Sequence, residues 1–199
     1  MLESLNLAVS VVIALVLHEL AHGFMSYKLG DPTPKAQGRL TLNPLAHLDP
    51  IGTICLFLFH VGWAKPVSIN YDYYKNKKLG TALVSLAGPC MNFIVALLSA
   101  LILKLCFAFN IPQLVGFFSI LMSLNIGLGV FNLIPLPPLD GSKVLAVILP
   151  SDVYDKYMAI EQYSMFILFA LLLTGVLDPI LTRGIMFITN LLFNLVGFV

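Results

Sequence analysis

Two long segments of this chain carry no charged side chain, and they limit its possible folds more than any other feature. Residues 84–103 and residues 114–134 contain no Asp, Glu, Lys or Arg. Each is close to the ~20 apolar residues that an α-helix needs to cross a bilayer. Because hydrocarbon offers no partner for backbone N–H and C=O groups, a helix is the expected form of both segments.

Three further apolar segments are candidate spans of a less simple kind. Residues 5–27 are long enough but include ionisable side chains, and we expect them to remain as the first helix. Residues 162–177 and 184–199 lie at the low limit of length, so flanking residues would have to complete each crossing.

The segment that begins at residue 51 is the least regular part of the pattern. Residues 51–62 are apolar but short, which favours a re-entrant element packed on protein. Residues 62–70 alternate weakly and predict an edge strand, or alternatively a loop anchored at the interface by Trp63. We therefore expect an all-α polytopic membrane protein, a single domain over residues 1–199. It should have about five to six transmembrane helices and a re-entrant or edge-strand element near residues 51–70.

Composition agrees with a lipid environment and disfavours several other classes. Hydrophobic residues make up 59% of the chain and charged residues 11%, whereas soluble domains carry about 25% charged residues. A soluble enzyme and a disordered chain are both disfavoured. The net charge of +1 gives no general attraction to polyanions, so we expect no nucleic-acid partner.

The distribution of basic residues predicts the orientation in the membrane. Seven of the eleven Lys and Arg residues fall between positions 28 and 78, and positively charged loops face the cytoplasm. We expect the N-terminus and residues 110–113 outside and residues 135–158 inside. The chain is then a multi-pass protein of the cell (plasma) membrane.

The first chemical signal is His18-Glu19-Leu20-Ala21-His22 in the first apolar segment. Histidines at positions i and i+4 share one helix face, which suits two imidazoles to one tetrahedral Zn²⁺. Glu19 is offset around the helix and can act as an acid–base group. Ionisable side chains in a membrane helix are costly unless they serve a site, so we predict one zinc per chain here.

A second signal offers the third ligand that a catalytic zinc usually takes. Asp140 follows three prolines that end an apolar helix, and broken backbone at membrane depth is tolerated where it lines a polar cavity. In the predicted topology His18, His22 and Asp140 all arrive on the cytoplasmic side. The alternative third ligand is Glu161, which lies later in the chain.

At this point the chain resembles the site-2 protease family of intramembrane zinc metalloproteases. The resemblance rests on His18 to His22, residues 43–52, residues 62–67, residues 87–92 and residues 132–141. It implies that His18, His22 and Asp140 bind zinc and that Glu19 is the catalytic acid–base group. The family cleaves peptide bonds in or near transmembrane helices of substrate proteins. No stretch here has the length or polarity of the PDZ insertion that many members carry, so the resemblance is to the compact form.

Three further polar residues are candidates for supporting roles. Asn92 and Asn132 lie in charge-free segments, where a buried amide must find partners. The resemblance suggests that Asn92 binds substrate or the oxyanion, and Asn132 allows the same interpretation. Both alternatively make helix-packing hydrogen bonds. His47 is either a group behind the metal ligands or a latch within its loop.

Two other functions remain open from the sequence. A prenyl-protein-type membrane zinc protease shares the His-Glu-x-x-His pattern but would use Glu161 as its third ligand. A zinc-bound membrane scaffold without activity would keep the ligands and need no acid–base group. The presence of Glu19 beside the ligands favours a zinc metalloendopeptidase.

Overall fold

The computed structural model describes residues 2–47, 49, 52 and 65–198, and these residues form helices and connecting segments without any strand. Five stretches of the described residues are long and apolar enough to cross a membrane. They are α1 (Leu2–Lys28), α4 (Lys77–Ala108), α5 (Pro112–Asn132), the run Ser151–Leu173 and α9 (Asp178–Val196). The prediction of an all-helical polytopic membrane protein is confirmed.

The shorter elements lie between these spans. The α2 helix (Thr33–Ala36) and two 3-10 turns, η1 (Pro44–Ala46) and η2 (Tyr71–Tyr73), belong to the long connection between α1 and α4. The run Ser151–Leu173 consists of α7 (Ser151–Met158), η3 (Ala159–Tyr163) and α8 (Ser164–Leu173). The apolar run at 162–177 is too short to cross a bilayer alone, and residues on its N-terminal side extend it to the candidate span Ser151–Leu173.

Three expected segments compare with the structure as follows: residues 62–70, residues 51–62 and residues 135–158. The expected edge strand is absent from residues 65–70, which form neither strand nor helix. The expected re-entrant element at 51–62 lies outside the described residues, apart from position 52. Residues 135–158, expected on the inner side, include both α7 and α6 (Asp140–Ile148).

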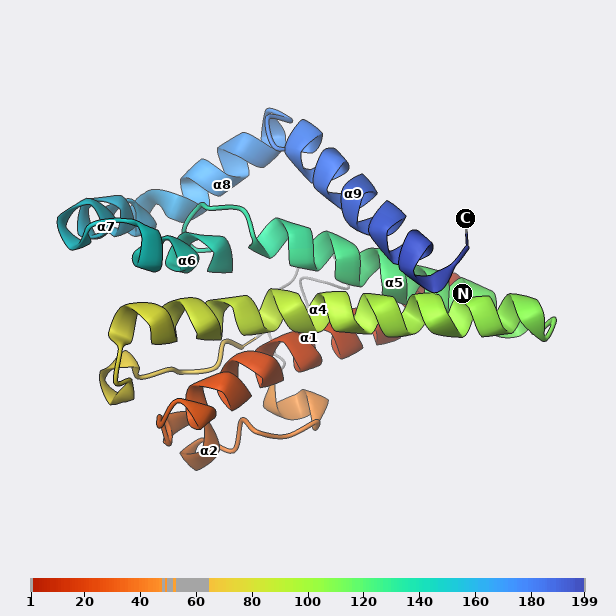
Figure 1. Ribbon diagram of the computed structural model, residues 1–199, viewed down its shortest axis with the longest axis horizontal. Helices are drawn as coiled ribbons and strands as arrows, with labels where there is room; N and C mark the ends of the chain where they lie inside the picture. Colours follow the sequence, from red (N-terminus) through yellow and green to blue (C-terminus); the bar gives the residue numbers. More distant parts are fainter. Residues whose placement is uncertain (1, 48, 50–51, 53–64, 199) are drawn as a thin grey trace.

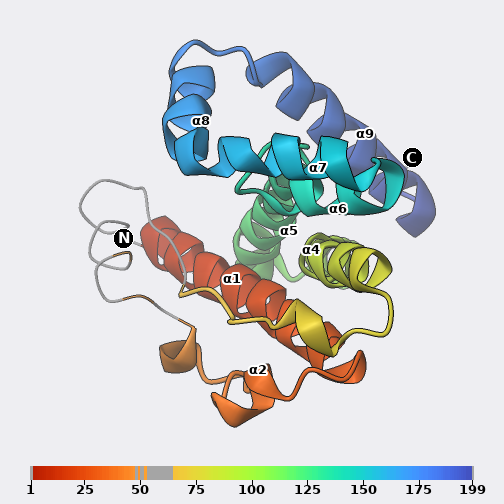
Figure 2. The same ribbon diagram turned by 90° about the vertical axis from the view of Figure 1, so that its left-hand side faces the viewer.

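The centre of the molecule is a bundle of α1, α4 and α5, which all contact one another. Figure 1 shows these helices side by side along the long axis, with α8 and α9 forming a bent pair over α5. In the end view of Figure 2, α6 and α7 lie above α4 on the opposite side from α2. Only α6 among the short helices packs extensively on α4, and this contact brings Asp140 to the bundle.

Small and polar residues, more than large apolar ones, decide which face of α1 points inward. Ser10, Ala14, His18, His22 and Ser26 follow one another at intervals of four and are all buried. Large apolar side chains of α1 often point outward instead; Leu2 is 69% and Leu5 59% exposed. Because lipid solvates apolar side chains, close packing and internal hydrogen bonds determine the buried face.

Beyond α1, the chain is tied back by a buried carboxylate. Asp31 is fully buried and accepts hydrogen bonds from Ser26 Oγ (2.8 Å), the Thr33 backbone N–H (2.9 Å) and the Asn70 backbone N–H (2.8 Å). The Tyr74 hydroxyl lies 2.7 Å from Ser26 Oγ. Asp31 therefore joins the end of α1 to the segment that begins at residue 65.

These bonds give a pH-dependent contribution to stability. Burial raises the pKa of the Asp31 carboxyl, but hydrogen bonds involving Thr33, Asn70 and Ser26 outweigh this effect and hold the pKa below its usual value. A lowered folded-state pKa means that the contribution is fully present above the unfolded-state pKa of about 4. It is lost as the pH falls through the folded-state value.

We predict that Asp31→Asn lowers the free energy of unfolding by about 1–3 kcal/mol at neutral pH, because an amide N–H₂ group would face backbone donors. Thermal unfolding in detergent measures the change, and the difference from wild type should shrink below about pH 4. The matched control is Asp72→Asn, whose carboxylate pairs with Lys77 at an exposed site and should change stability little. Equal effects of the two substitutions would contradict the assignment.

Candidate metal centre and active site

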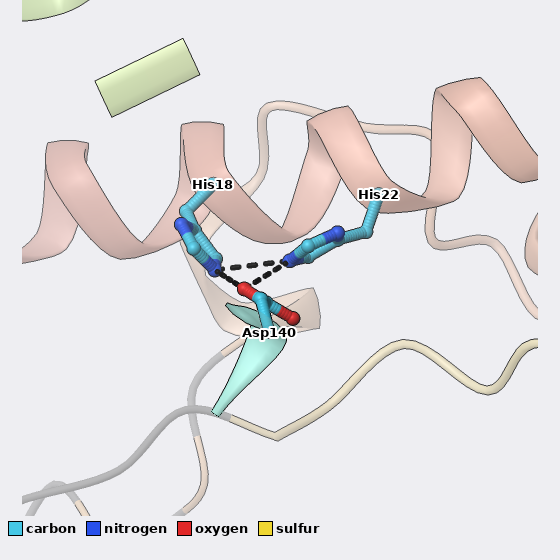
Figure 3. A group of neighbouring side chains, drawn as sticks. All are labelled: His18, His22 and Asp140. Atoms are coloured by element: carbon cyan, nitrogen blue, oxygen red, sulfur yellow. Dashed lines mark hydrogen bonds and ion pairs between the residues drawn. The ribbon is translucent and has the colours of Figure 1, made fainter. Parts of the chain in front are cut away.

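The structure brings His18, His22 and Asp140 to one point. The Nε2 atoms of the two histidines lie 3.0 Å apart, and each lies 3.2 Å from Asp140 Oδ2. In Figure 3 both imidazoles point from α1 toward the carboxylate at the start of α6. Among the described residues, these three side chains form the one group of His, Cys, Asp and Glu that is suited to hold a metal ion. Glu161, the alternative third ligand, is in η3 and is not part of this group.

Each imidazole has a hydrogen-bond partner at Nδ1, and this partner fixes which ring nitrogen carries the proton. His22 Nδ1 lies 2.7 Å from the Val84 carbonyl oxygen, which can only accept a hydrogen bond. His22 therefore carries its proton on Nδ1 and leaves the Nε2 lone pair free, which is the tautomer required of a metal ligand at Nε2.

His18 is oriented by a directional chain of amide groups. Its Nδ1 lies 2.6 Å from Asn92 Oδ1. Asn92 Nδ2 donates to Asn125 Oδ1 at 2.8 Å, and Asn125 Nδ2 donates to the Leu121 carbonyl oxygen at 2.8 Å. Because the last acceptor is a backbone carbonyl, every link has a fixed direction and His18 must donate from Nδ1.

These tautomers show that the residues fit a zinc ion. Both Nε2 lone pairs and a carboxylate oxygen converge within one small volume, which is an electron-rich arrangement that a divalent cation neutralises. Two imidazoles and one carboxylate are also a ligand set that catalytic zinc sites use, with one position left open. The Val84 carbonyl oxygen and the Asn92 side chain, which accept hydrogen bonds from the two histidines, complete the arrangement.

Helix packing at this point is unusually close because α4 carries a glycine. A Cβ atom at Gly88 would lie only 2.6 Å from His18 Cε1 and would also clash with His22 Nε2. A second close approach occurs at Gly141, where a Cβ would lie 2.6 Å from the Ile134 carbonyl oxygen. The two glycines let α4 and the chain before α6 close around the histidines.

Glu19 lies next to the candidate metal-binding group but does not belong to it. Its Oε2 accepts a hydrogen bond from the Val67 backbone N–H at 3.0 Å. Glu19, the three ligands and Asn132 line a common cavity of about 210 Å³. The carboxylate is therefore held at the cavity wall, close to the metal ligands.

The remaining predicted residues lie in different settings. Asn132 lines the cavity while its Nδ2 donates to the Leu128 carbonyl oxygen at 3.0 Å. Asn92 is fully buried and contacts His18 from behind, which favours an orienting role over contact with substrate. His47 is fully buried, and its Nε2 lies 2.8 Å from the Thr41 carbonyl oxygen, which favours the loop latch.

Sequence reasoning missed two polar residues of this region. Asn125 completes the amide chain behind His18, and its presence in a charge-free segment was the available signal. Lys143 also lines the cavity. It follows Asp140 by three residues in α6, so helix periodicity alone places both on neighbouring positions of one face.

Fold and site together define a class: a polytopic membrane protein with a His, His, carboxylate metal centre and an adjacent glutamate. A family model described as peptidase family M50 matches residues 6–175. The chain belongs to this family, that of the site-2 proteases.

Similar proteins are named as zinc metalloproteases. The chain is 40% identical over 189 residues to a Bacillus subtilis protein named "Putative zinc metalloprotease YwhC", covering 89% of this chain and 86% of the relative. It is 30% identical to Rip2 of Mycolicibacterium smegmatis over 84% of this chain and 66% of that protein. It is 29% identical to the zinc metalloprotease MJ0392 of Methanocaldococcus jannaschii, over 72% of this chain and 34% of that protein. No solved structure matches significantly. This protein is a zinc metalloprotease of the membrane.

The amide chain makes a specific prediction about zinc affinity. Asn92→Ala removes the acceptor of His18 Nδ1, so the imidazole loses its fixed tautomer and orientation. We expect zinc affinity to fall about 10–100-fold, as when groups behind metal ligands are removed. Competition with a chelator, followed by metal analysis of the purified protein, measures it.

A matched control is Ser99→Ala. Ser99 is also a buried polar residue of α4, but its Oγ donates within the helix to the Val95 carbonyl oxygen. This variant should keep the wild-type zinc affinity. Unchanged affinity in Asn92→Ala would show that the contact does not orient His18.

Proposed function

We propose that this membrane zinc protease hydrolyses peptide bonds in or near the transmembrane segments of other proteins. The observation that carries the proposal is the position of the site: His18, Glu19 and His22 belong to a helix that can span a membrane. Asp140 begins α6 soon after the end of a second such helix, α5. A substrate that reaches these groups must approach within the helical bundle, where transmembrane segments of other proteins are the available peptides.

In this proposal His18, His22 and Asp140 hold the zinc ion. Zinc, when bound, supplies a Lewis acid that lowers the pKa of water and polarises a carbonyl group. Glu19 accepts the proton from the attacking water at its carboxylate and donates it to the leaving amine nitrogen. The hydrogen bond from the Val67 N–H to Glu19 Oε2 leaves Oε1 free for this transfer.

The segment beside Glu19 is suited to receive an extended peptide. Pro66, Val67 and Ile69 line the same cavity as the metal ligands, and residues 65–70 are outside any helix or strand. Free backbone groups in such a segment can hydrogen-bond an extended substrate. A substrate helix must unwind there before its carbonyl group reaches the site.

We also propose that the protein lies in the cell (plasma) membrane, with its site toward the cytoplasm. The C-terminal end of α1 and the N-terminal end of α4 meet at the site, as the contact of His22 with Val84 requires. The basic residues between positions 28 and 78 belong to the chain at this end, and basic loops remain on the cytoplasmic side.

Cysteine labelling tests this orientation in a variant that lacks the native cysteines. A cysteine at position 77 should react with an impermeant reagent only from the cytoplasmic side. A cysteine at position 113, at the opposite end of α4 and α5, should react only from outside. Labelling of both positions from the same side would contradict the proposed topology.

The main prediction separates protease from scaffold. In Glu19→Gln the amide oxygen can still accept the bond from Val67, while the proton acceptor is lost. The variant should therefore fold and bind about one zinc per chain. Its cleavage of a single-span membrane substrate in liposomes should fall by at least the roughly 10²–10⁴-fold that general acid–base catalysis supplies.

Glu3→Gln is the matched control, because Glu3 lies at the start of the same helix and should leave cleavage unchanged. Equal cleavage by Glu19→Gln and wild type would exclude Glu19 as the acid–base group. Zinc-loaded wild type that cleaves none of several helix-destabilised substrates would favour the scaffold.

A further inference from the structure

A second cavity adjoins the catalytic one. It has a volume of about 470 Å³ and lies between the start of α4 and the helices α7 and η3. Tyr71 and Lys143 line both cavities. The two cavities are therefore neighbours, and Tyr71 and Lys143 lie at the boundary that they share. We call the second cavity the passage.

The passage is rich in groups that donate hydrogen bonds. Its lining includes three ammonium groups and four hydroxyl groups, of Lys77, Lys78, Lys143, Tyr71, Thr81, Ser151 and Tyr154. Two carboxylates, those of Asp155 and Glu161, also line it. Because Lys77 is already paired with Asp72, the two remaining ammonium groups are matched in number by the two carboxylates. The contacts of each lysine therefore decide which one is available to a bound peptide.

Lys143 differs from the other two lysines because it has no partner within the described chain. Lys77 forms an ion pair with Asp72 at 2.6 Å, and Lys78 donates to the Leu149 carbonyl oxygen at 3.2 Å. Lys143 is half-buried and makes neither a hydrogen bond nor an ion pair with any described residue, the carboxylates of the passage included. A half-buried charge without a partner is unfavourable, and an acceptor from a bound molecule would relieve it.

We propose that Lys143 binds the carboxylate of an acidic side chain of the substrate, within a few residues of the scissile bond. This proposal rests on the proposed function and names a sequence preference of the same site. Lys143 follows Asp140 by three residues in α6, so its ammonium group and the metal ligand belong to one helix face. A substrate whose scissile carbonyl lies at the metal centre would extend through the passage and bring an Asp or Glu to Lys143. Substrates with Asp or Glu at that position are then preferred over those with neutral residues.

Paired substrates test the preference. A single-span substrate is made with Glu or Gln at each position within about four residues of the cleavage site, and kcat/KM is measured in liposomes. At one position wild type should favour Glu about tenfold, the size of one charge-assisted hydrogen bond. Lys143→Gln should lose this preference, so that its kcat/KM values for the Glu and Gln substrates become equal. Lys143→Glu should instead favour a substrate with Lys at that position.

Two further variants make the test specific. Lys143→Arg keeps the charge and should keep the preference for Glu. Lys156→Gln removes an exposed charge from α7 outside the passage lining and should behave as wild type. Zinc content is measured in each variant, so that loss of the metal centre is not mistaken for loss of binding.

Several outcomes would overturn the proposal. One is an active wild type that cleaves Glu and Gln substrates equally at every position. Another is a Lys143→Gln variant that loses activity on both substrates to the same extent, because this would assign Lys143 to the reaction itself or to folding. If wild type cleaves no substrate, the proposed function fails separately. In that case the affinities of the Glu and Gln peptides for the zinc-loaded protein are measured. Equal affinities would reject the proposal that Lys143 binds an acidic side chain.

Discussion

A polar group at membrane depth must find its partner inside the protein, and this requirement determines how α1, α4 and α5 pack. Two imidazoles on α1 would be costly in lipid by themselves. The structure satisfies one with the Val84 carbonyl oxygen and the other with the amide of Asn92. Asn92 in turn bonds to Asn125 of α5. The hydrogen bonds that prepare two metal ligands are therefore the same bonds that hold three spanning helices together.

The site also requires backbones to approach one another closely, and glycine makes this possible at two positions, Gly88 in α4 and Gly141 in α6. Any side chain at Gly88 would displace the two imidazoles, and any side chain at Gly141 would meet the carbonyl groups of Leu133 and Ile134. In lipid, where apolar burial gives little preference between helix faces, such small residues decide which faces meet. The site is consequently a product of helix packing as much as of its ligands.

The sequence predicted the parts of this structure that depend on local pattern. Helix periodicity alone places His18 and His22 on one face, and long uncharged segments alone indicate α4 and α5. Asp140 could be named because it follows three prolines that end an apolar helix, and the charge-derived topology agreed by bringing it to the side of the histidines. Partners far apart in the chain could not be predicted: His18 and Asn92 are 74 residues apart. For the same reason two interpretations of Asn92 stayed open, a contact with substrate or oxyanion that the resemblance suggested and a helix-packing hydrogen bond. Nothing local in the sequence reveals that its carbonyl oxygen faces an imidazole.

Glu19 shows how a charged side chain can be held beside the candidate metal centre without being one of its ligands. Glu19 is held at the cavity wall by the backbone N–H of Val67. The segment that carries Val67 is itself fixed where Asp31 accepts the N–H of Asn70. Asp31 lies just past the end of α1, the helix that carries His18 and His22. The contacts of Asp31 with Asn70 and of Val67 with Glu19 therefore link the end of α1 back to the Glu19 side chain of the same helix. Neither of these contacts involves the group of His18, His22 and Asp140, so the Glu19 carboxylate is held at the cavity wall without a metal ion. The proposed acid–base role requires a carboxylate that is held in this way.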